Sequence, residues 1–311
     1  MVTGGAGFIG AHLCRELLGR PVVDRVVVLD DLSTGSAANL DGLDVELVEG
    51  SILDRPLLGT VIDGADAVVH LAARPSVPRS IAEPLASHEV NVTGTLNVLE
   101  ACRPGTVHMV IASSSSVYGS VAALPKHEEL ATRPQSPYAA SKLSAESYAL
   151  AYSAAFGVPT LALRFFNVYG PLQRAGHAYA AVIPAFVEAA LAGRPLPVQG
   201  DGGQSRDFTY VGTLARVLAD AVVGKVTSAD PVNLAFGTRT TLTDLVAVLA
   251  DVLGQPLEVV HGPRRIGDVR DSQAATGRLR DLFPGVVPVP LRDGLAQTVA
   301  WFRETARIPV S

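Results

Sequence analysis

Cysteine, aromatic residues and long apolar runs are all scarce in this chain of 311 residues. The two cysteines, Cys14 and Cys102, fall in predicted helices at no metal-like spacing, so we expect them to be small buried hydrophobes. The seven histidines form no His-x-x-x-His pair, so we expect no metal site. A net charge of -5 argues against nucleic acid as a partner.

Segments that would direct the chain to a membrane are also lacking. No run reaches the roughly 18 apolar residues that a membrane span needs, and the chain opens on a glycine-rich turn instead of a charged and then apolar leader. We therefore expect a cytoplasmic protein that does not bind membranes.

What the chain does have is a regular alternation of strand-like and helical patterns, with 48% hydrophobic residues to build a core. The predicted strands are Val26–Leu29, Val45–Val48, Ala67–Leu71, Val107–Ala112 and Thr160–Phe166, and the predicted helices are Ala11–Leu18, Leu85–Cys102 and Pro137–Phe156. Such alternation predicts an α/β fold with a doubly wound parallel sheet. After Phe166, prolines and glycines interrupt shorter elements, which suggests a substrate-binding portion.

Gly4, Gly7 and Gly10 open the first helical pattern and are typical of a dinucleotide-binding turn. Glycines let the backbone approach a pyrophosphate closely, and the helix N-terminus offers free N–H groups. The first long apolar run ends at Asp30, about twenty residues after the glycines, where a carboxylate can accept from an adenosine ribose. This carboxylate would repel a 2′-phosphate and no arginine is adjacent, so NAD is favoured over NADP.

Tyr138 and Lys142 stand four residues apart behind Ser136 and Pro137, which predict the start of a helix. The tyrosine and lysine would share one helix face, and a nearby ammonium favours the phenolate. Tyr138 is thus a candidate general base, with hydroxyls available from the run Ser113–Ser116. The alternative is an amphipathic helix with a solvated lysine and a half-buried tyrosine.

Together these motifs resemble the extended branch of the short-chain dehydrogenase/reductase superfamily, the NAD-dependent nucleotide-sugar epimerases and dehydratases. The resemblance covers nearly the whole chain. Other stretches that carry it are His70–Ala73, Asn91–Thr95, Ser114–Gly119, Arg164–Pro171, Arg206–Phe208 and Arg265–Asp268. It implies a Rossmann-type domain over residues 1–167 with a return segment at about 208–235. A smaller α/β domain over 168–207 and 236–311 would bind the nucleotide sugar, and a homodimer would form through the helices 85–102 and 137–156.

The resemblance also implies roles for individual residues, with Ser114, Tyr138 and Lys142 as the catalytic set. The implied cofactor contacts are Gly4, Gly7, Phe8, Ile9, Gly10, Asp30, Asp31, Ser51, Ile52, Leu71, Ala72, Ala73, Asn91, Tyr138, Lys142 and Phe165. The implied substrate contacts are Ser114, Ser115, Ser116, Asn167, Arg174, Val182, Val198, Arg206, Arg265 and Asp268.

Two departures from the family pattern stand out. Only Met1, Val2 and Thr3 precede Gly4, so the first strand is either unusually short or lacks its beginning. Ser51 stands where the family commonly has an aspartate that contacts adenine, and it would offer a weaker hydrogen bond.

The reaction type follows from which acids are missing after Ser114. The family's dehydratases carry an Asp-Glu pair at the places of Ser115 and Ser116, and its decarboxylases keep a glutamate at the place of Ser116. Without these acids, the site is expected to oxidise a sugar hydroxyl at C4 and return the hydride to the other face. Arg174 stands where uronate 4-epimerases have an arginine, so a UDP-sugar with a C6 carboxylate is favoured, namely UDP-glucuronate converted to UDP-galacturonate.

Three other functions stay open at this point. The first is a 4-epimerase of UDP-glucose or UDP-N-acetylglucosamine, since the small Ser272 leaves room for an N-acetyl group. The second is a net-redox nucleotide-sugar dehydrogenase or reductase. The third is a non-catalytic NAD-binding regulator, against which the intact Ser114, Tyr138 and Lys142 argue.

Overall fold

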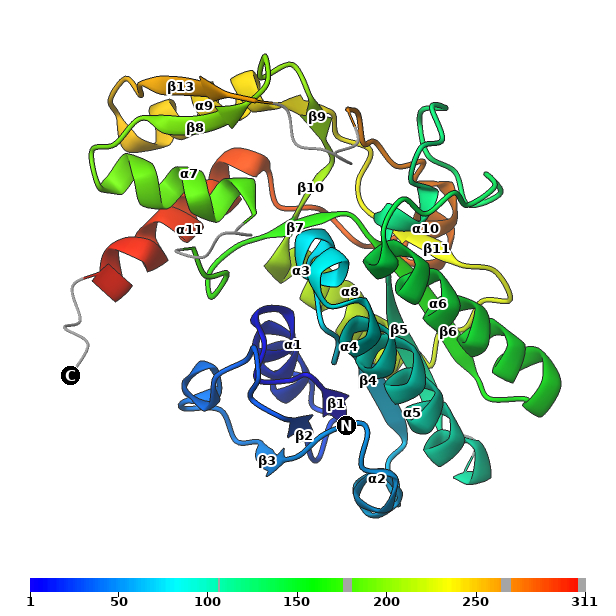
Figure 1. The fold of residues 1–311 in the computed structure, drawn as a ribbon. Coiled ribbons are helices and arrows are strands. Elements are labelled where there is room, and N and C mark those ends of the chain that lie inside the picture. Colours follow the sequence, from blue (N-terminus) through cyan, green and yellow to red (C-terminus); the bar gives the residue numbers. More distant parts are fainter. Residues whose placement is uncertain (106, 176–180, 264–269, 307–311) are drawn as a thin grey trace.

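Buried apolar runs pair into one parallel sheet of seven strands in a computed structural model that describes residues 1–105, 107–175, 181–263 and 270–306 (Figure 1). In spatial order the strands are β11 (Val232–Leu234), β6 (Thr160–Phe165), β5 (His108–Ser114), β4 (Ala67–His70), β1 (Val2–Thr3), β2 (Val27–Asp30) and β3 (Glu46–Glu49). Every residue of β4 and β6 is buried, as expected for a parallel sheet covered on both faces.

Helices cover the two faces of this sheet. One face carries α1 (Phe8–Leu18), α8 (Val211–Val223) and α10 (Gly277–Leu282), and the other carries α2 (Arg55–Ile62), α5 (Thr95–Cys102) and α6 (Pro137–Phe156). Strand β11 joins the edge of this sheet, and α8 packs in the apolar core on its α1 face. Cys14 and Cys102 are buried and free, so their predicted role as small core residues is confirmed.

The first strand is short, as expected, with only two residues. It lies between β2 and β4, and the amino group of Met1 donates to the Ala67 carbonyl oxygen at 2.8 Å. The chain runs from β1 outward to β3 and then returns to β4 on the other side of β1. The carboxyl ends of β1 and β4 thus form the switch point where ligands bind in open α/β sheets.

The predicted helix 85–102 is interrupted. It consists of α4 (Pro84–His88), a π-helical stretch (Glu89–Gly94) and α5, and it is preceded by the separate short helix α3 (Val77–Ala82). At the π-helical stretch, the Thr95 hydroxyl donates to the Asn91 carbonyl oxygen at 2.7 Å. Thr95 thus contacts this carbonyl oxygen with its side chain where the π-helical stretch meets α5.

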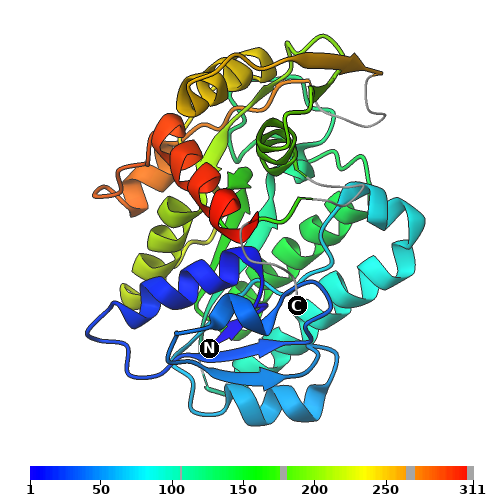
Figure 2. The ribbon, with the colours of Figure 1, turned by 90° about the vertical axis from the view of Figure 1, so that its left-hand side faces the viewer.

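The remaining elements form a smaller lobe beside the carboxyl ends of the sheet (Figures 1 and 2). Its strands are β7 (Asn167–Tyr169), β8 (Leu196–Gln199), β9 (Ser205–Arg206), β10 (Phe208–Tyr210), β12 (Thr240–Thr241) and β13 (Val259–Gly262), and its helices are α7 (Val182–Leu191), α9 (Leu242–Leu253) and α11 (Leu291–Ala306). Pairs β7–β10 and β8–β13 are parallel, and β9–β12 is antiparallel. A separate apolar cluster holds this lobe together, and Phe8 and Ile9 of α1 pack against it.

None of the helices in the described ranges combines the length and the apolar character that crossing a membrane requires.

Candidate active site

A cleft of about 760 Å³ opens at the carboxyl ends of the central strands. Most residues predicted to contact the cofactor line it, together with the three predicted catalytic residues. The predicted residues in its walls are Gly4, Gly7, Phe8, Ile9, Gly10, Asp30, Asp31, Ile52, Leu71, Ala72, Ala73, Ser114, Tyr138, Lys142 and Phe165. The fold thus gathers positions that are up to 161 residues apart in the chain.

The glycine turn is shaped for close approach of a ligand. Gly4 has φ of 71°, and a Cβ added there would stand 2.6 Å from the Ala72 nitrogen. A Cβ on Gly10 would stand 2.3 Å from the Gly4 carbonyl oxygen. Only glycine fits both positions, so the turn packs directly against the start of α1 and the loop after β4.

Asp30 is fixed at the adjacent strand end. One of its carboxylate oxygens accepts from the Ala6 N–H and the other from the Leu32 N–H, each at 2.9 Å. Burial raises the pKa of this carboxyl group, and these two N–H donors act in the opposite direction. The carboxylate therefore joins the glycine turn to the wall of the cleft. Turn and acid together fit a dinucleotide whose ribose has a free 2′-hydroxyl.

Tyr138 and Lys142 point into the cleft from α6, which begins at the predicted proline and has Ser136 as its N-cap. The Lys142 ammonium donates to the Ala112 carbonyl oxygen at 2.9 Å, and burial lowers its pKa to about 8. Burial also raises the pKa of Tyr138, while a hydrogen bond with Ser114 acts in the opposite direction. Burial is therefore the larger influence on the Tyr138 pKa in this geometry, and the lowering of that pKa by Lys142 stays a prediction.

Ser114 is the serine of the run that takes part in this arrangement. Its hydroxyl accepts from the N–H and the hydroxyl of Ser116, at 3.2 and 2.9 Å. The Ser113 hydroxyl instead donates to Glu146 at 2.6 Å, in a buried ion pair between Glu146 and Arg164. Ser114 thus lies in the cleft wall together with Tyr138, and its catalytic role stays a prediction.

Two predicted cofactor contacts lie outside the cleft wall. The Ser51 hydroxyl accepts from the Leu53 N–H at 3.2 Å in a local turn. Asn91 is buried, where its amide accepts from the Arg74 N–H at 2.7 Å and donates to the Ser141 hydroxyl at 2.9 Å. Asn91 therefore holds the loop after β4 from behind, while Gly50 and Ile52 line the cleft on either side of Ser51 in the sequence.

The structure brings fewer of the predicted substrate residues to the cleft. Among the described residues, the predicted contacts that do not line it are Ser115, Ser116, Asn167, Arg174, Val182, Val198 and Arg206. Val198 is buried in the core of the smaller lobe, and Arg174 is exposed next to Gln173, which does line the cleft. Arg265 and Asp268 lie outside the described residues.

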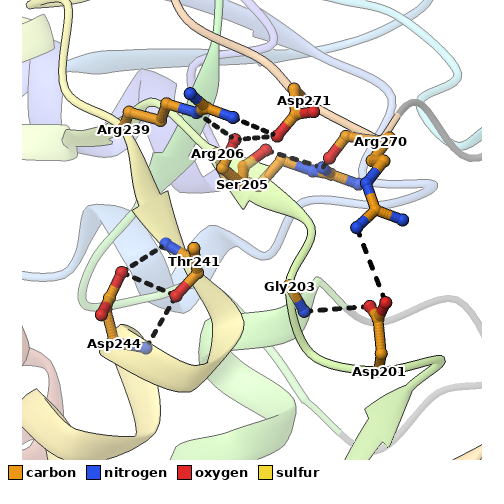
Figure 3. A network of polar contacts seen from close by, with 9 residues as sticks. All are labelled: Asp201, Gly203, Ser205, Arg206, Arg239, Thr241, Asp244, Arg270 and Asp271. Carbon is orange, nitrogen blue, oxygen red and sulfur yellow. Dashed lines mark hydrogen bonds and ion pairs between the residues drawn. The ribbon is translucent and has the colours of Figure 1, made fainter.

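Arg206 belongs to a polar network on the smaller lobe (Figure 3). Its guanidinium donates to the carbonyl oxygens of Ser205 and Arg270 at 2.8 and 3.1 Å. Asp271 accepts from the Ser205 hydroxyl at 2.6 Å and from Arg239 at 3.1 Å. These contacts fix strand β9 against residues 270–272.

Several cleft residues were not identified from the sequence. The charged ones are Arg74, Arg79 and Glu83, and the Arg74 guanidinium forms an ion pair with Glu83. Arg74 directly follows the stretch His70–Ala73 at the end of β4. Its position near a strand end could therefore have identified it as a cleft residue. Arg79 and Glu83 lie on and beside α3, a helix that the sequence analysis did not predict.

A Rossmann-type sheet, a glycine turn with an acid at the next strand end, and a buried Tyr-x-x-x-Lys pair define the class of nicotinamide-cofactor enzymes. The model of the NAD dependent epimerase/dehydratase family matches residues 1–271, and the chain belongs to this family. The predictions of the family, of a Rossmann-type fold, of NAD as the cofactor and of an enzyme of the isomerase class are confirmed.

Known proteins and solved structures match this chain over nearly its whole length. A UDP-glucose 4-epimerase of Mycolicibacterium smegmatis is 37% identical over 99% of both chains. The UDP-N-acetylglucosamine 4-epimerase of Methanobrevibacter ruminantium superimposes with a TM-score of 0.92 at 34% identity, covering 98% and 97% of the two chains. The UDP-glucuronic acid 4-epimerase of Bacillus cereus, solved with UDP-glucuronic acid and NAD, gives 0.89 at 29% identity and 98% coverage of both.

Proposed function

We propose that this enzyme is a UDP-sugar 4-epimerase whose preferred substrate is UDP-glucuronate, converted to UDP-galacturonate. The observation that carries the reaction type is that Ser114, Tyr138 and Lys142 line one NAD-sized cleft, while serines occupy the two places where the family's dehydratases have acids. NAD supplies the hydride acceptor when it is bound. Residues of the protein carry out proton transfer and hold the substrate.

Proton transfer is assigned to Tyr138 and Ser114. Both residues line the cleft and Ser114 acts on the pKa of Tyr138, so Ser114 can pass the proton of a sugar C4 hydroxyl to the phenol oxygen. Because burial keeps the Tyr138 pKa high, the base must act next to positive charge, and the Lys142 ammonium lines the same cleft. Return of the hydride to the opposite face of C4, together with return of the proton from Tyr138 to the C4 oxygen, inverts the sugar and leaves no net redox change.

Substrate preference is assigned to Arg174. Its side chain is exposed and its sequence neighbour Gln173 lines the cleft, which supports a position for Arg174 at the mouth of the cleft. A carboxylate at C6 can form a charge-assisted hydrogen bond with it, which a neutral hexose cannot. We assign the diphosphate and uridine to residues 168–207 and 236–311, with Asn167, Arg206, Arg265 and Asp268 among the contacts.

The test compares initial rates of Arg174→Ala and the unmodified enzyme on UDP-glucuronate and UDP-glucose. A charge-assisted hydrogen bond contributes roughly 1.5–3 kcal/mol, so the preference for UDP-glucuronate should fall about tenfold or more. Arg194→Ala, which removes another exposed arginine, is the control and should leave the preference unchanged. Equal losses on both sugars would make a neutral UDP-hexose, glucose or N-acetylglucosamine, the better assignment.

We also infer a homodimer through α4, α5 and α6. Leu85 is 84% exposed and Tyr148 of α6 is 41% exposed, so an apolar surface is available on these elements. Burying it against a second copy removes apolar area from water. Light scattering should give twice the mass of one chain, and Leu85→Glu should reduce that mass.

A further inference from the structure

Ser80 connects helix α3 to the backbone of Tyr138. Its hydroxyl accepts from the Tyr138 N–H at 3.0 Å and donates to the Val77 carbonyl oxygen at 2.7 Å. Ser80 has 0% exposure, so water cannot replace either partner.

This contact completes the N-terminus of α6. The first N–H groups of a helix have no partner within it, and Pro137 has no N–H to satisfy. The Ala139 N–H donates to the Ser136 hydroxyl at 3.1 Å, and the Ala140 N–H donates to the Ser136 carbonyl oxygen at 3.0 Å. The Tyr138 N–H is left, and its acceptor comes from a different helix.

Helix α3 is itself held in place and reaches the cleft. The Ser76 hydroxyl accepts from the Arg79 N–H at 3.3 Å and caps the helix, while Arg79 lines the cleft next to Ser80 in the sequence. The wall of the cleft and the backbone of Tyr138 are therefore joined through one buried hydroxyl.

We propose that Ser80 is a positioning residue for the reaction, one that holds Tyr138 where its phenol meets Ser114. This inference rests on the proposed role of Tyr138 as the base. Without the Ser80 hydroxyl, the first turn of α6 keeps an unpaired buried N–H and can move to find a partner. A displacement of about 1 Å at a reacting group can cost about 100-fold in rate, so a shift of a fraction of this should cost about tenfold.

The chain contains a matched control for this substitution. Ser87 on α4 is also a buried serine, at 1% exposure, but its hydroxyl has no hydrogen-bond partner. Ser87→Ala removes the same atom without breaking a contact. It should leave kcat within about twofold of the unmodified enzyme, because substitutions that break no specific interaction have small effects.

The experiment measures kcat, KM, NAD content and the pH dependence of kcat for Ser80→Ala, Ser80→Cys and Ser87→Ala. Both Ser80 variants should lose about tenfold in kcat with KM and NAD content little changed. Their acid limb should move to higher pH, because a displaced Tyr138 loses the Ser114 hydrogen bond that lowers its pKa. Ser80→Cys keeps the volume with a weak acceptor, so it covers the case that Ser80→Ala does not fold.

A folded Ser80 variant with kcat within twofold and an unmoved pH profile would overturn this inference, as would equal losses in the Ser87 control. If Tyr138→Phe is inactive and Ser80→Ala is normal, only the role of Ser80 fails. If Tyr138→Phe stays active, the proposed function fails as well.

Discussion

The NAD end of the cleft and its sugar end recognise ligands in different ways. At the NAD end, backbone groups of the glycine turn and the ends of β1, β2 and β4 form the wall, and most predicted contacts line it. At the sugar end, the predicted contacts are side chains on loops and short strands, and most of the described ones lie outside the wall. A binding site formed by backbone groups at strand ends can be located from sequence motifs. A site formed by side chains on loops can be located only once the fold is known.

Of the substitutions considered, Tyr138→Phe should reduce activity most. It tests the place in the cleft where the NAD end and the sugar end meet. It removes the proton acceptor and little volume, so we expect the epimerisation rate to fall by about 10²–10⁴-fold with NAD still bound. Tyr148→Phe, on the same helix but 41% exposed, should keep its activity. Steady-state rates and the NAD content of both proteins provide the measurement, and more than a tenth of the original rate in Tyr138→Phe would remove the assignment.

Ion pairs differ between the large sheet domain and the smaller lobe. Below the cleft, Arg164 and Glu146 are 4% and 3% exposed, whereas in the smaller lobe Arg239 and Asp271 are 54% and 23% exposed. Glu146→Ala leaves a buried guanidinium without its partner and should lower the free energy of unfolding by about 3–5 kcal/mol. Asp271→Ala breaks an exposed ion pair and the hydrogen bond from the Ser205 hydroxyl, so it should lower the free energy of unfolding by less, about 1–2 kcal/mol. Urea unfolding of both variants tests this, and equal losses would mean that burial does not separate the two networks.

Asp30→Ala tests how far the NAD end depends on one side chain. The substitution removes a ribose acceptor, so NAD affinity should fall by about tenfold or more, and discrimination against NADP should weaken because the repulsive charge disappears. Titration calorimetry with each cofactor measures both effects, with the exposed Asp44→Ala as the control. An unchanged preference for NAD would place the ribose elsewhere.

Sequence patterns predicted much of this molecule for physical reasons. Helix α6 has its predicted ends because the Ser136 side chain caps its N-terminus, Pro137 fits its first turn and Gly157 tolerates the left-handed conformation after its last residue. At Gly4 and Gly10, a Cβ would clash with the backbone. The π-helical stretch at residues 89–94 was not predicted, because apolar spacing indicates a helix but not which hydrogen-bond ladder the helix uses. The four-residue spacing placed Tyr138 and Lys142 on one helix face, but it does not reveal that the Lys142 ammonium bonds to the Ala112 carbonyl oxygen.

The separation of Ser51 and Asn91 from the cleft has a similar cause. Both stand next to residues that line it, but the backbone turns their side chains toward Leu53 and Ser141. Motif position identifies the segment, and local hydrogen bonds then decide which side chain faces the ligand.

The central claim is that this enzyme inverts C4 of a UDP-sugar without net oxidation. The most direct measurement incubates the purified protein, without added cofactor, with UDP-glucuronate and with UDP-glucose, and follows the sugars by NMR and NADH by absorbance. We predict that the two C4 epimers of each accepted sugar reach equilibrium, that UDP-glucuronate reacts faster, and that NADH does not accumulate. Stoichiometric NADH, or a keto sugar that has lost water, would contradict the account.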